Sequence, residues 1–431
     1  MNWCVVIFFI FLLWILWKTC RESHGLLSLP FLIMLYIVFL YLGSLYFYFT
    51  EGHYTFLFVF FMAFFYLVGI YLANLLVHLQ ERLLFDKPLS IYTPVNLSIL
   101  RFALSAMFFL VLGIAIYRLY KFGVPLFEQT WYTKGIRSTT GISNRLLFTT
   151  GVESLIIMCL ISYGMWKSQN KLVFKYLMLQ FFIFYIIFKL LQGGKEAAIM
   201  PFLLMGMAIF YNTRKIPKKL ILLSGAAIFV LILLVGSFWT GVFSIDKIFN
   251  LFYVRVTSIA ALHVDYLLYG WAPNHSYELG NTVLLEFKRF VAQVTSIPKE
   301  PLFNEFIGNL KAGHSLSKVT GVSPELSLFG MAYANFGILG AVFSALIFVF
   351  IVQRMNIHLL SRRSMNIFSF TLWIYFFLKL LGFVRGGNVL ITLETFLIGV
   401  IPALTMIAIT YFCLALPFPS AMRWKRYSWE T

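Results

Sequence analysis

The stretch from Gly321 to Val352 is where the sequence most clearly predicts chemistry, because a polar, turn-rich segment runs directly into a long apolar helix. Ser323-Pro324-Glu325 is typical of a helix start: Ser can cap it, Pro is tolerated in the first turn, and an acid complements the helix dipole. Glu325 therefore stands at the entrance of a predicted membrane span, as a catalytic base or only as a structural cap. His314, just before this stretch, is the second candidate base.

Basic side chains are the second chemical signal. A guanidinium can contact phosphate oxygens bidentately, which makes Arg the preferred residue for an anionic ligand. Lys195 follows Gly193-Gly194 at a predicted helix start, where its ammonium and the first helix amides could face one phosphate together. For each cation the alternative is a solvated loop charge or contact with lipid headgroups. The candidate cations are Arg137, Lys195, Arg255 and Arg289.

Motifs for metals, cofactors and activated nucleophiles are absent from the sequence. It contains no GxSxG, HExxH, Walker or DxD pattern, and its four cysteines are far apart in or beside apolar runs. We therefore expect no metal and no cofactor. Chemistry would use an ordinary acid or base, with cations stabilising the leaving group.

These residues must be positioned by helices in a membrane. With 61% hydrophobic and only 12% charged residues, the chain is too apolar for a soluble globule. Apolar runs long enough to cross about 30 Å of hydrocarbon predict an all-α polytopic membrane protein with about 11 transmembrane helices in a single domain, residues 1–431. The runs are 3–17, 26–50, 54–78, 101–119, 147–166, 172–191, 196–212, 220–240, 327–353, 366–384 and 390–413.

The distribution of Lys and Arg predicts the orientation. Clusters of basic residues flank alternate helix ends, which places those ends and the C-terminus in the cytoplasm and the N-terminus outside. The outer face then carries two long loops, 118–146 and 241–326, which we expect to contain short helices. Both loops are also basic, against the usual tendency, and this favours an anionic ligand such as a lipid-linked phosphate or diphosphate.

Two charges in the last two predicted spans are expected to pair. Lys379 and Glu394 are equally distant in sequence from the turn at 385–388, so two antiparallel helices would bring them to a similar depth. The alternative is that Glu394 faces a polar cavity and belongs with the functional acids.

The order of these parts resembles the Wzy-type O-antigen or oligosaccharide repeat-unit polymerases, membrane glycosyltransferases of the GT-C class. Residues 193–198 (GGKEAA) resemble the family's glycine and basic motif at a helix start. Segments 253–256 (YVRV), 280–282 (GNT) and 290–301 (FVAQVTSIPKEP) look like its second long loop. Residues 328–340 (LFGMAYANFGILG) are similar to its best-marked stretch, in which an aromatic-x-Asn-Phe-Gly element opens a late span.

Two departures from related patterns bear on the activity. Related O-antigen ligases carry a His eleven positions before a glycine of this late helix, and counting back from Gly337 gives Leu326. That favours polymerase over ligase. An Arg-x10-Gly pattern described in some polymerases is also missing, so no catalytic Arg is inferred from it.

The resemblance implies a multi-pass enzyme of the bacterial cytoplasmic (inner) membrane with its active site on the outer, periplasmic face. It would polymerise polyprenyl-diphosphate-linked oligosaccharide units into a surface polysaccharide of the O-antigen or capsule type. A hydroxyl of the acceptor unit would attack the anomeric carbon of the donor, releasing the lipid diphosphate without a metal. The expected partners are this lipid-linked oligosaccharide, membrane lipid and a chain-length regulator protein, with no nucleic acid. Glu325 and His314 are then the bases, and Arg137, Lys195, Arg255 and Arg289 the diphosphate-binding cations.

The alternatives are a lipid-linked oligosaccharide transporter or flippase, an O-antigen ligase, and an accessory membrane protein. Transporters usually show paired repeats and helices broken near the middle of the membrane. This chain instead concentrates polar residues in two loops on one predicted face, which favours the enzyme.

Overall fold

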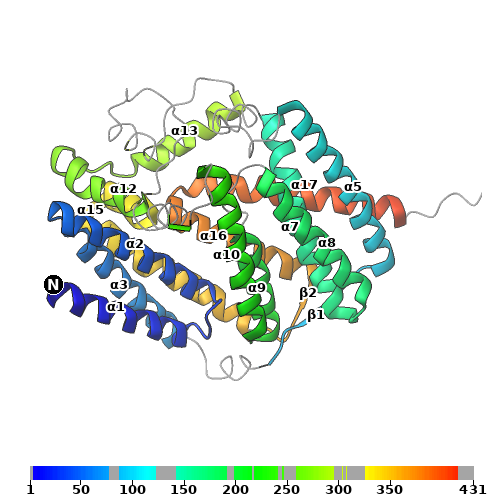
Figure 1. Ribbon diagram of the computed structural model, residues 1–431, viewed down its shortest axis with the longest axis horizontal. Coiled ribbons are helices and arrows are strands. Elements are labelled where there is room, and N and C mark those ends of the chain that lie inside the picture. The colour runs from blue at the N-terminus through cyan, green and yellow to red at the C-terminus, as the bar shows by residue number, and fades with distance from the viewer. Residues whose placement is uncertain are drawn as a thin grey trace, which may run out of the picture.

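The computed structural model describes residues 3–76, 87–122, 142–191, 199–215, 218–240, 245–246, 259–295, 303, 307 and 326–415. These residues are mostly helical (Figure 1). The long helices are α1 (Trp3–Glu22), α2 (Leu29–Glu51), α3 (Thr55–Leu75), α5 (Leu97–Phe122), α7 (Ile142–Gln169), α8 (Leu172–Leu191), α9 (Met200–Thr213), α10 (Lys218–Thr240), α15 (Ser327–Ser361), α16 (Ile367–Gly386) and α17 (Val389–Ala415). Between α10 and α15 lie α12 (Ile259–Asp265), a π-helical turn (Tyr266–Trp271), a 3₁₀ turn (Ala272–Asn274) and α13 (Asn281–Thr295).

Each predicted apolar run coincides with a helix, but the count of eleven spans is not supported. In the described ranges, five helical segments are long and apolar enough to cross a membrane: α2, α3, residues Leu97–Tyr117 of α5, α15 and α16. Helix α9 has 14 residues and extends only about 21 Å at 1.5 Å per residue. Helix α1 carries Lys18, Arg21 and Glu22 in its last turns. The chain is therefore a helical membrane protein, and its number of spans was predicted wrongly.

The all-α prediction also missed two short strands. Strands β1 (Ser90–Tyr92) and β2 (Ser364–Asn366) pair in parallel, with Ile91 opposite Met365. The Asn212 side chain, at the end of α9, donates to the Leu89 carbonyl at 2.7 Å, and its backbone carbonyl accepts from the Leu89 amide at 2.8 Å. Three-residue strands are too short to show a period-2 pattern, so the sequence carries no sign of them.

Helices α3 and α15 cross closely because a glycine lies at their contact. A Cβ atom on Gly69 would collide with the Val349 side chain and lie 2.8 Å from the Leu346 carbonyl oxygen. Small residues allow this close approach, and in lipid such van der Waals contact is a main source of helix association. Gly113, in α5, has no neighbouring atom within 4 Å of the same position.

This contrast predicts different effects for two identical substitutions. Gly69→Ala should lower the stability of the purified protein in detergent by about 1–3 kcal/mol, the usual cost of overpacking a close contact. Gly113→Ala should leave it unchanged or raise it slightly, because alanine favours helix. The midpoint of thermal unfolding measures both, and equal midpoints for the two variants would show that the α3–α15 contact is not tight.

Buried amide side chains join four helices at one end of the bundle, called here the Arg214 end. Gln353 of α15 donates to the Asn74 side chain of α3 at 2.7 Å and to the backbone carbonyl of Glu22 in α1 at 3.0 Å. The Tyr211 hydroxyl of α9 donates to the Asn356 side chain at 2.7 Å. Buried amides need such partners, so this network links the four helices at this end.

Arg214 itself caps the C-terminal end of α15. Its guanidinium donates to the carbonyl oxygens of Leu359, Leu360 and Arg362 at 3.1, 2.9 and 3.3 Å. Burial lowers the pKa of Arg214 to about 10, so the side chain remains charged at neutral pH. A cation at this position satisfies carbonyls that have no partner within the helix and complements its dipole.

Candidate functional site

The opposite end of the bundle, called here the His53 end, begins with the turn between α2 and α3. Gly52 adopts φ 73° as the C-cap of α2, a conformation that suits glycine. The amide of Gly52 donates to the Tyr48 carbonyl at 3.1 Å, and the amide of His53 donates to the Phe47 carbonyl at 3.3 Å. This hydrogen-bonded turn fixes the backbone from which the side chains of Glu51 and His53 project.

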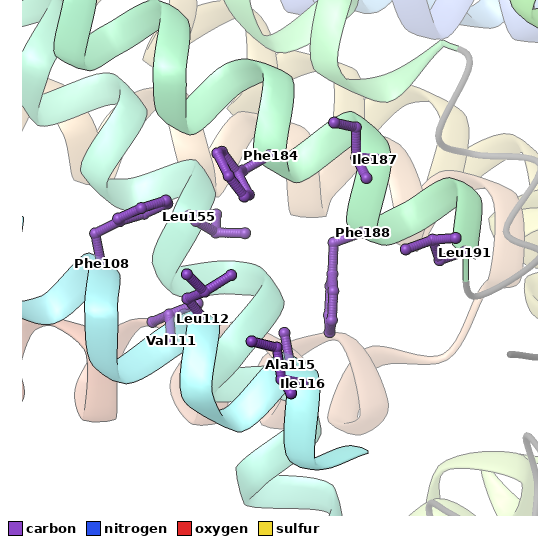
Figure 2. Close-up of a pocket in the computed structure, with 10 residues that line it drawn as sticks. All are labelled: Phe108, Val111, Leu112, Ala115, Ile116, Leu155, Phe184, Ile187, Phe188 and Leu191. Atoms are coloured by element: carbon purple, nitrogen blue, oxygen red, sulfur yellow. The ribbon is translucent and has the colours of Figure 1, made fainter. Parts of the chain in front are cut away.

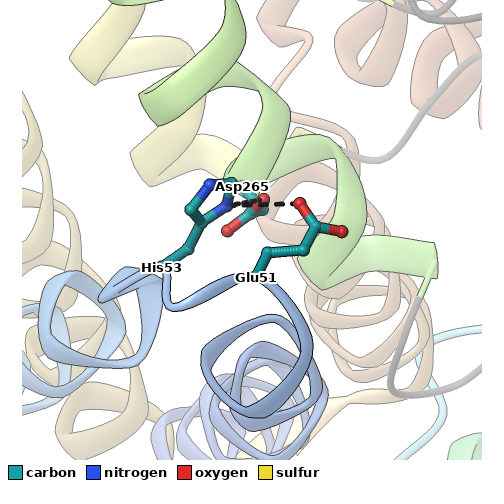
Figure 3. Close-up of side chains that lie close together, drawn as sticks. All are labelled: Glu51, His53 and Asp265. Carbon is teal, nitrogen blue, oxygen red and sulfur yellow. Dashed lines mark hydrogen bonds and ion pairs between the residues drawn. The ribbon is translucent and has the colours of Figure 1, made fainter.

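Asp265, the last residue of α12, lies against this turn and is only 4% exposed. Its carboxylate accepts a hydrogen bond from the Thr55 hydroxyl. It accepts another, at 2.8 Å, from Nδ1 of His53 (Figure 3). Glu51 places a carboxylate oxygen 3.5 Å from the same nitrogen. Because Nδ1 faces the carboxylates, we assign the proton to it, which leaves Nε2 as the basic nitrogen on the far side of the ring.

An aromatic surface extends from His53 toward α15. The Tyr269 ring stacks on the imidazole, with centroids 4.0 Å apart and planes 5° apart, and its hydroxyl accepts from the Tyr54 amide at 2.7 Å. Farther along, the rings of Tyr277 and Tyr333 meet edge to face. Tyr54, Tyr269 and Tyr277 are exposed. Exposed tyrosines offer an apolar face and a polar edge to a ligand, or form the aromatic belt of a membrane interface.

Helix α15 is broken at Gly337, which has φ 67° and ψ −156°. The Tyr277 ring occupies the space where a Cβ would lie, 2.8 Å from that position, so both the backbone and the space require glycine. The carbonyls of Ala334 and Asn335 accept instead from the amides of Glu278 and Leu279, each at 3.0 Å. The break therefore anchors the segment that leads into α13.

The Asn335 side chain strengthens this anchor. Its oxygen accepts from the Gly280 amide at 2.8 Å, and its nitrogen donates to the Thr282 hydroxyl at 2.7 Å and to the Met331 carbonyl at 2.8 Å. Asn335 is the asparagine of the ANFG element that the sequence singled out. The structure thus gives this residue a positioning role at the start of α13.

Helix α13 is tied to α17 as well. Glu286 is buried and accepts from the Leu390 amide at 2.7 Å, which caps the N-terminal end of α17. Arg289 is partly buried and follows Glu286 by three residues, so it lies on the same side of α13. The helix therefore presents a predicted cation at the junction of α15 and α17.

Of the predicted site residues, the structure describes Arg289 alone. It lies on α13, one of the short helices that the structure describes within residues 241–326. The segments that carry the other predicted residues lie outside the described ranges, so their roles remain predictions. These residues are Glu325, His314, Arg137, Lys195 and Arg255.

Sequence reasoning missed the His53–Asp265 pair. The two residues are 212 positions apart, and no local motif connects them. The available signal was the Glu-Gly-His turn on the predicted outer side between two strongly apolar runs, where a His is unusual. The described residues also include one group with the composition of a metal site. The atoms of Glu51, His53 and Asp265 that could bind a metal ion lie within 4.8 Å of one another. Both oxygens of Asp265 accept hydrogen bonds, from His53 and from Thr55.

An apolar hollow of about 100 Å³ lies between α5, α7 and α8 (Figure 2). Apolar cavities of ~150 Å³ bind molecules of the size of benzene, so this one fits part of a hydrocarbon chain and offers no acid or base. Its lining consists of Phe108, Val111, Leu112, Ala115, Ile116, Leu155, Phe184, Ile187, Phe188 and Leu191.

Lys379 has an acidic partner that the sequence did not predict. Its ammonium lies 3.1 Å from the carboxylate of Glu153 in α7, and the Tyr375 hydroxyl donates to the same carboxylate at 2.7 Å. The pairing comes from the packing of α7 against α16. The side chain of Glu394, the predicted partner, lies outside the described residues, so that part of the prediction remains open.

This pair predicts a specific order of stabilities. Glu153→Gln alone should destabilise the protein by about 3–5 kcal/mol, because it leaves the Lys379 charge without its partner. Adding Lys379→Met should recover much of the loss, because the uncompensated charge is then removed. Thermal unfolding in detergent compares the variants, with Glu394→Gln as the matched control. A larger loss for Glu394→Gln than for Glu153→Gln would restore Glu394 as the principal partner.

Comparison of the chain with protein-family models, with curated proteins and with solved structures finds no match. What the site can do therefore follows from its geometry. The His53 end combines an oriented imidazole with an exposed aromatic surface, whereas Arg289 lies on α13, one turn beyond the residue that binds α17. The imidazole could remove a proton from a bound ligand.

Proposed function

We propose that the protein is a glycosyltransferase that joins oligosaccharide units carried on a polyprenyl diphosphate at the outer face of the bacterial cytoplasmic membrane. This is the repeat-unit polymerase activity implied by the sequence resemblance. The observation that carries the proposal is the His53–Asp265 pair, at the end of the bundle that the Lys and Arg distribution predicts to be outside. The polymerase needs a base at that face, and the pair supplies one.

In the proposed reaction, Nε2 of His53 accepts the proton of the acceptor hydroxyl. The hydroxyl oxygen bonds to the anomeric carbon while the bond from that carbon to the diphosphate oxygen breaks, and the lipid diphosphate leaves with the bonding electrons. Asp265 holds the imidazole in place and stabilises the imidazolium that forms, as a carboxylate does in a catalytic triad. Glu325 and His314 remain the alternative bases.

The departing diphosphate requires cations. Arg289 is the described residue for this role, because α13 is held firmly between α15 and α17 and a preorganised cation stabilises developing charge best. Lys195 follows closely after the end of α8, whose last turns line the apolar hollow. A polyprenyl chain in the hollow would bring its diphosphate toward the end of α8.

The base assignment is tested with His53→Gln. Loss of a general base should lower the rate of chain extension by about 10²–10⁴-fold, with normal protein level. Asp265→Asn should also slow extension, because the His53 imidazole loses the carboxylate that orients it. The matched control is His275→Gln, since His275 belongs to the long loop that carries Asp265 and stacks on Trp271. Extension of purified lipid-linked units is the measurement, with Glu325→Gln and His314→Ala in parallel. Normal extension by His53→Gln would remove His53 from the site.

The cation assignment is tested with Arg289→Gln, compared with Lys288→Gln on the exposed side of the same helix. If Arg289 stabilises the leaving diphosphate, its loss should reduce the extension rate by about 10²-fold or more, and Lys288→Gln should have a small effect. Equal rates for the two variants would exclude Arg289 from the reaction.

One observation favours a second function, a lipid-linked oligosaccharide flippase. Helix α15 is broken at Gly337, about 15 Å from its start at 1.5 Å per residue, and helices broken within the membrane are frequent in transporters. The two functions separate in reconstituted vesicles. A flippase moves labelled lipid-linked units between leaflets without lengthening the saccharide, whereas a polymerase lengthens it in detergent solution.

A further inference from the structure

Helix α13 has the reverse of the amphipathic pattern expected for a water-facing helix. Its polar residues Thr282 and Glu286 are buried against the protein, whereas large apolar side chains point outward. A helix on a water-exposed surface buries its apolar side and exposes its polar side. The outward residues are Val283, Leu284, Phe287 and Val291, and Phe287 is 54% exposed. The last three follow Val283 by one, four and eight residues, which places all four on one side of the helix. This side is called here the outward face of α13.

The orientation of α13 is fixed by specific bonds and is not a loose surface contact. Asn335 holds the start of the helix through Gly280 and Thr282. Glu286 holds its middle through the Leu390 amide of α17. Rotating the helix to bury the outward face would break these bonds and leave a buried carboxylate without its partner, at high cost. The outward face must therefore meet an apolar medium.

The exposed apolar surfaces of two long helices lie next to this face. Leu279, which is 76% exposed, donates its amide to α15 beside the exposed Phe336. On α17, Leu393 is exposed one turn after the amide that Glu286 caps. Helix α15 is long and apolar enough to cross a membrane. The outward face of α13 is thus continuous with surfaces that lipid must cover.

We propose that α13 lies in the plane of the membrane interface, with Val283, Leu284, Phe287 and Val291 inserted among the acyl chains of the leaflet at the His53 end. Lys288 is exposed beside them, and a long ammonium side chain reaches from this depth to the lipid phosphates. The occupant of the outward face is therefore phospholipid. A second copy of the chain or another protein is the competing occupant.

Spin labelling of the full-length protein in lipid nanodiscs tests this placement. The four native cysteines are first replaced by serine or alanine, and a nitroxide is attached to Phe287→Cys or, in a second variant, to Leu284→Cys. Collision rates with oxygen, which concentrates in lipid, and with a water-soluble nickel chelate then report the surroundings of each label. The references are Phe343→Cys, on the exposed surface of α15, and Lys171→Cys, in the connection between α7 and α8.

We expect both α13 labels to show an oxygen-to-nickel ratio close to that of position 343 and at least several-fold above that of position 171. A ratio like that of position 171 would place the outward face in water and overturn the proposal. Low accessibility to both reagents would mean that protein covers the face, and would overturn it in favour of a second copy or a partner. Variants whose elution volume differs from the parent are excluded, and the two positions provide independent readings.

Discussion

Amide and charged side chains inside this protein need partners from the protein itself, because lipid offers none. At the Arg214 end this constraint produces a network in which Gln353, Asn74, Asn356 and Tyr211 satisfy one another across helices that are distant in sequence. Arg214 adds a cation on the carbonyls that end α15. These bonds hold the helices to one another at the Arg214 end.

The His53 end is built differently. Its parts come from a tight turn, a short helix and a broken helix, and backbone groups supply many of the bonds. The break at Gly337 exchanges hydrogen bonds within α15 for bonds to Glu278 and Leu279, so the loop segment is joined to the span by main-chain pairing. A small cluster of buried apolar side chains, which includes Leu267, Trp271 and Met331, packs the same segments against the start of α15.

The sequence predicted much of the helical framework and little of the site. Apolar runs identify helices because hydropathy is a local property, and each run did form a helix. The number of spans was wrong because an apolar run that forms a helix need not be long enough to cross a membrane, as the 14 residues of α9 show. The pairs His53–Asp265 and Lys379–Glu153, and strands β1 and β2, join residues distant in sequence. Which distant helices pack together is set by the whole fold, so no local pattern encodes those contacts.

The double attachment of α13 has a mechanical consequence. The start of the helix is bonded to Asn335 of α15, close to the break, and its middle to the Leu390 amide of α17, so α13 bridges two long helices. Any increase in the distance between α15 and α17 would have to stretch or break the bonds of Asn335 and Glu286. Arg289 lies on α13 and would move with that helix.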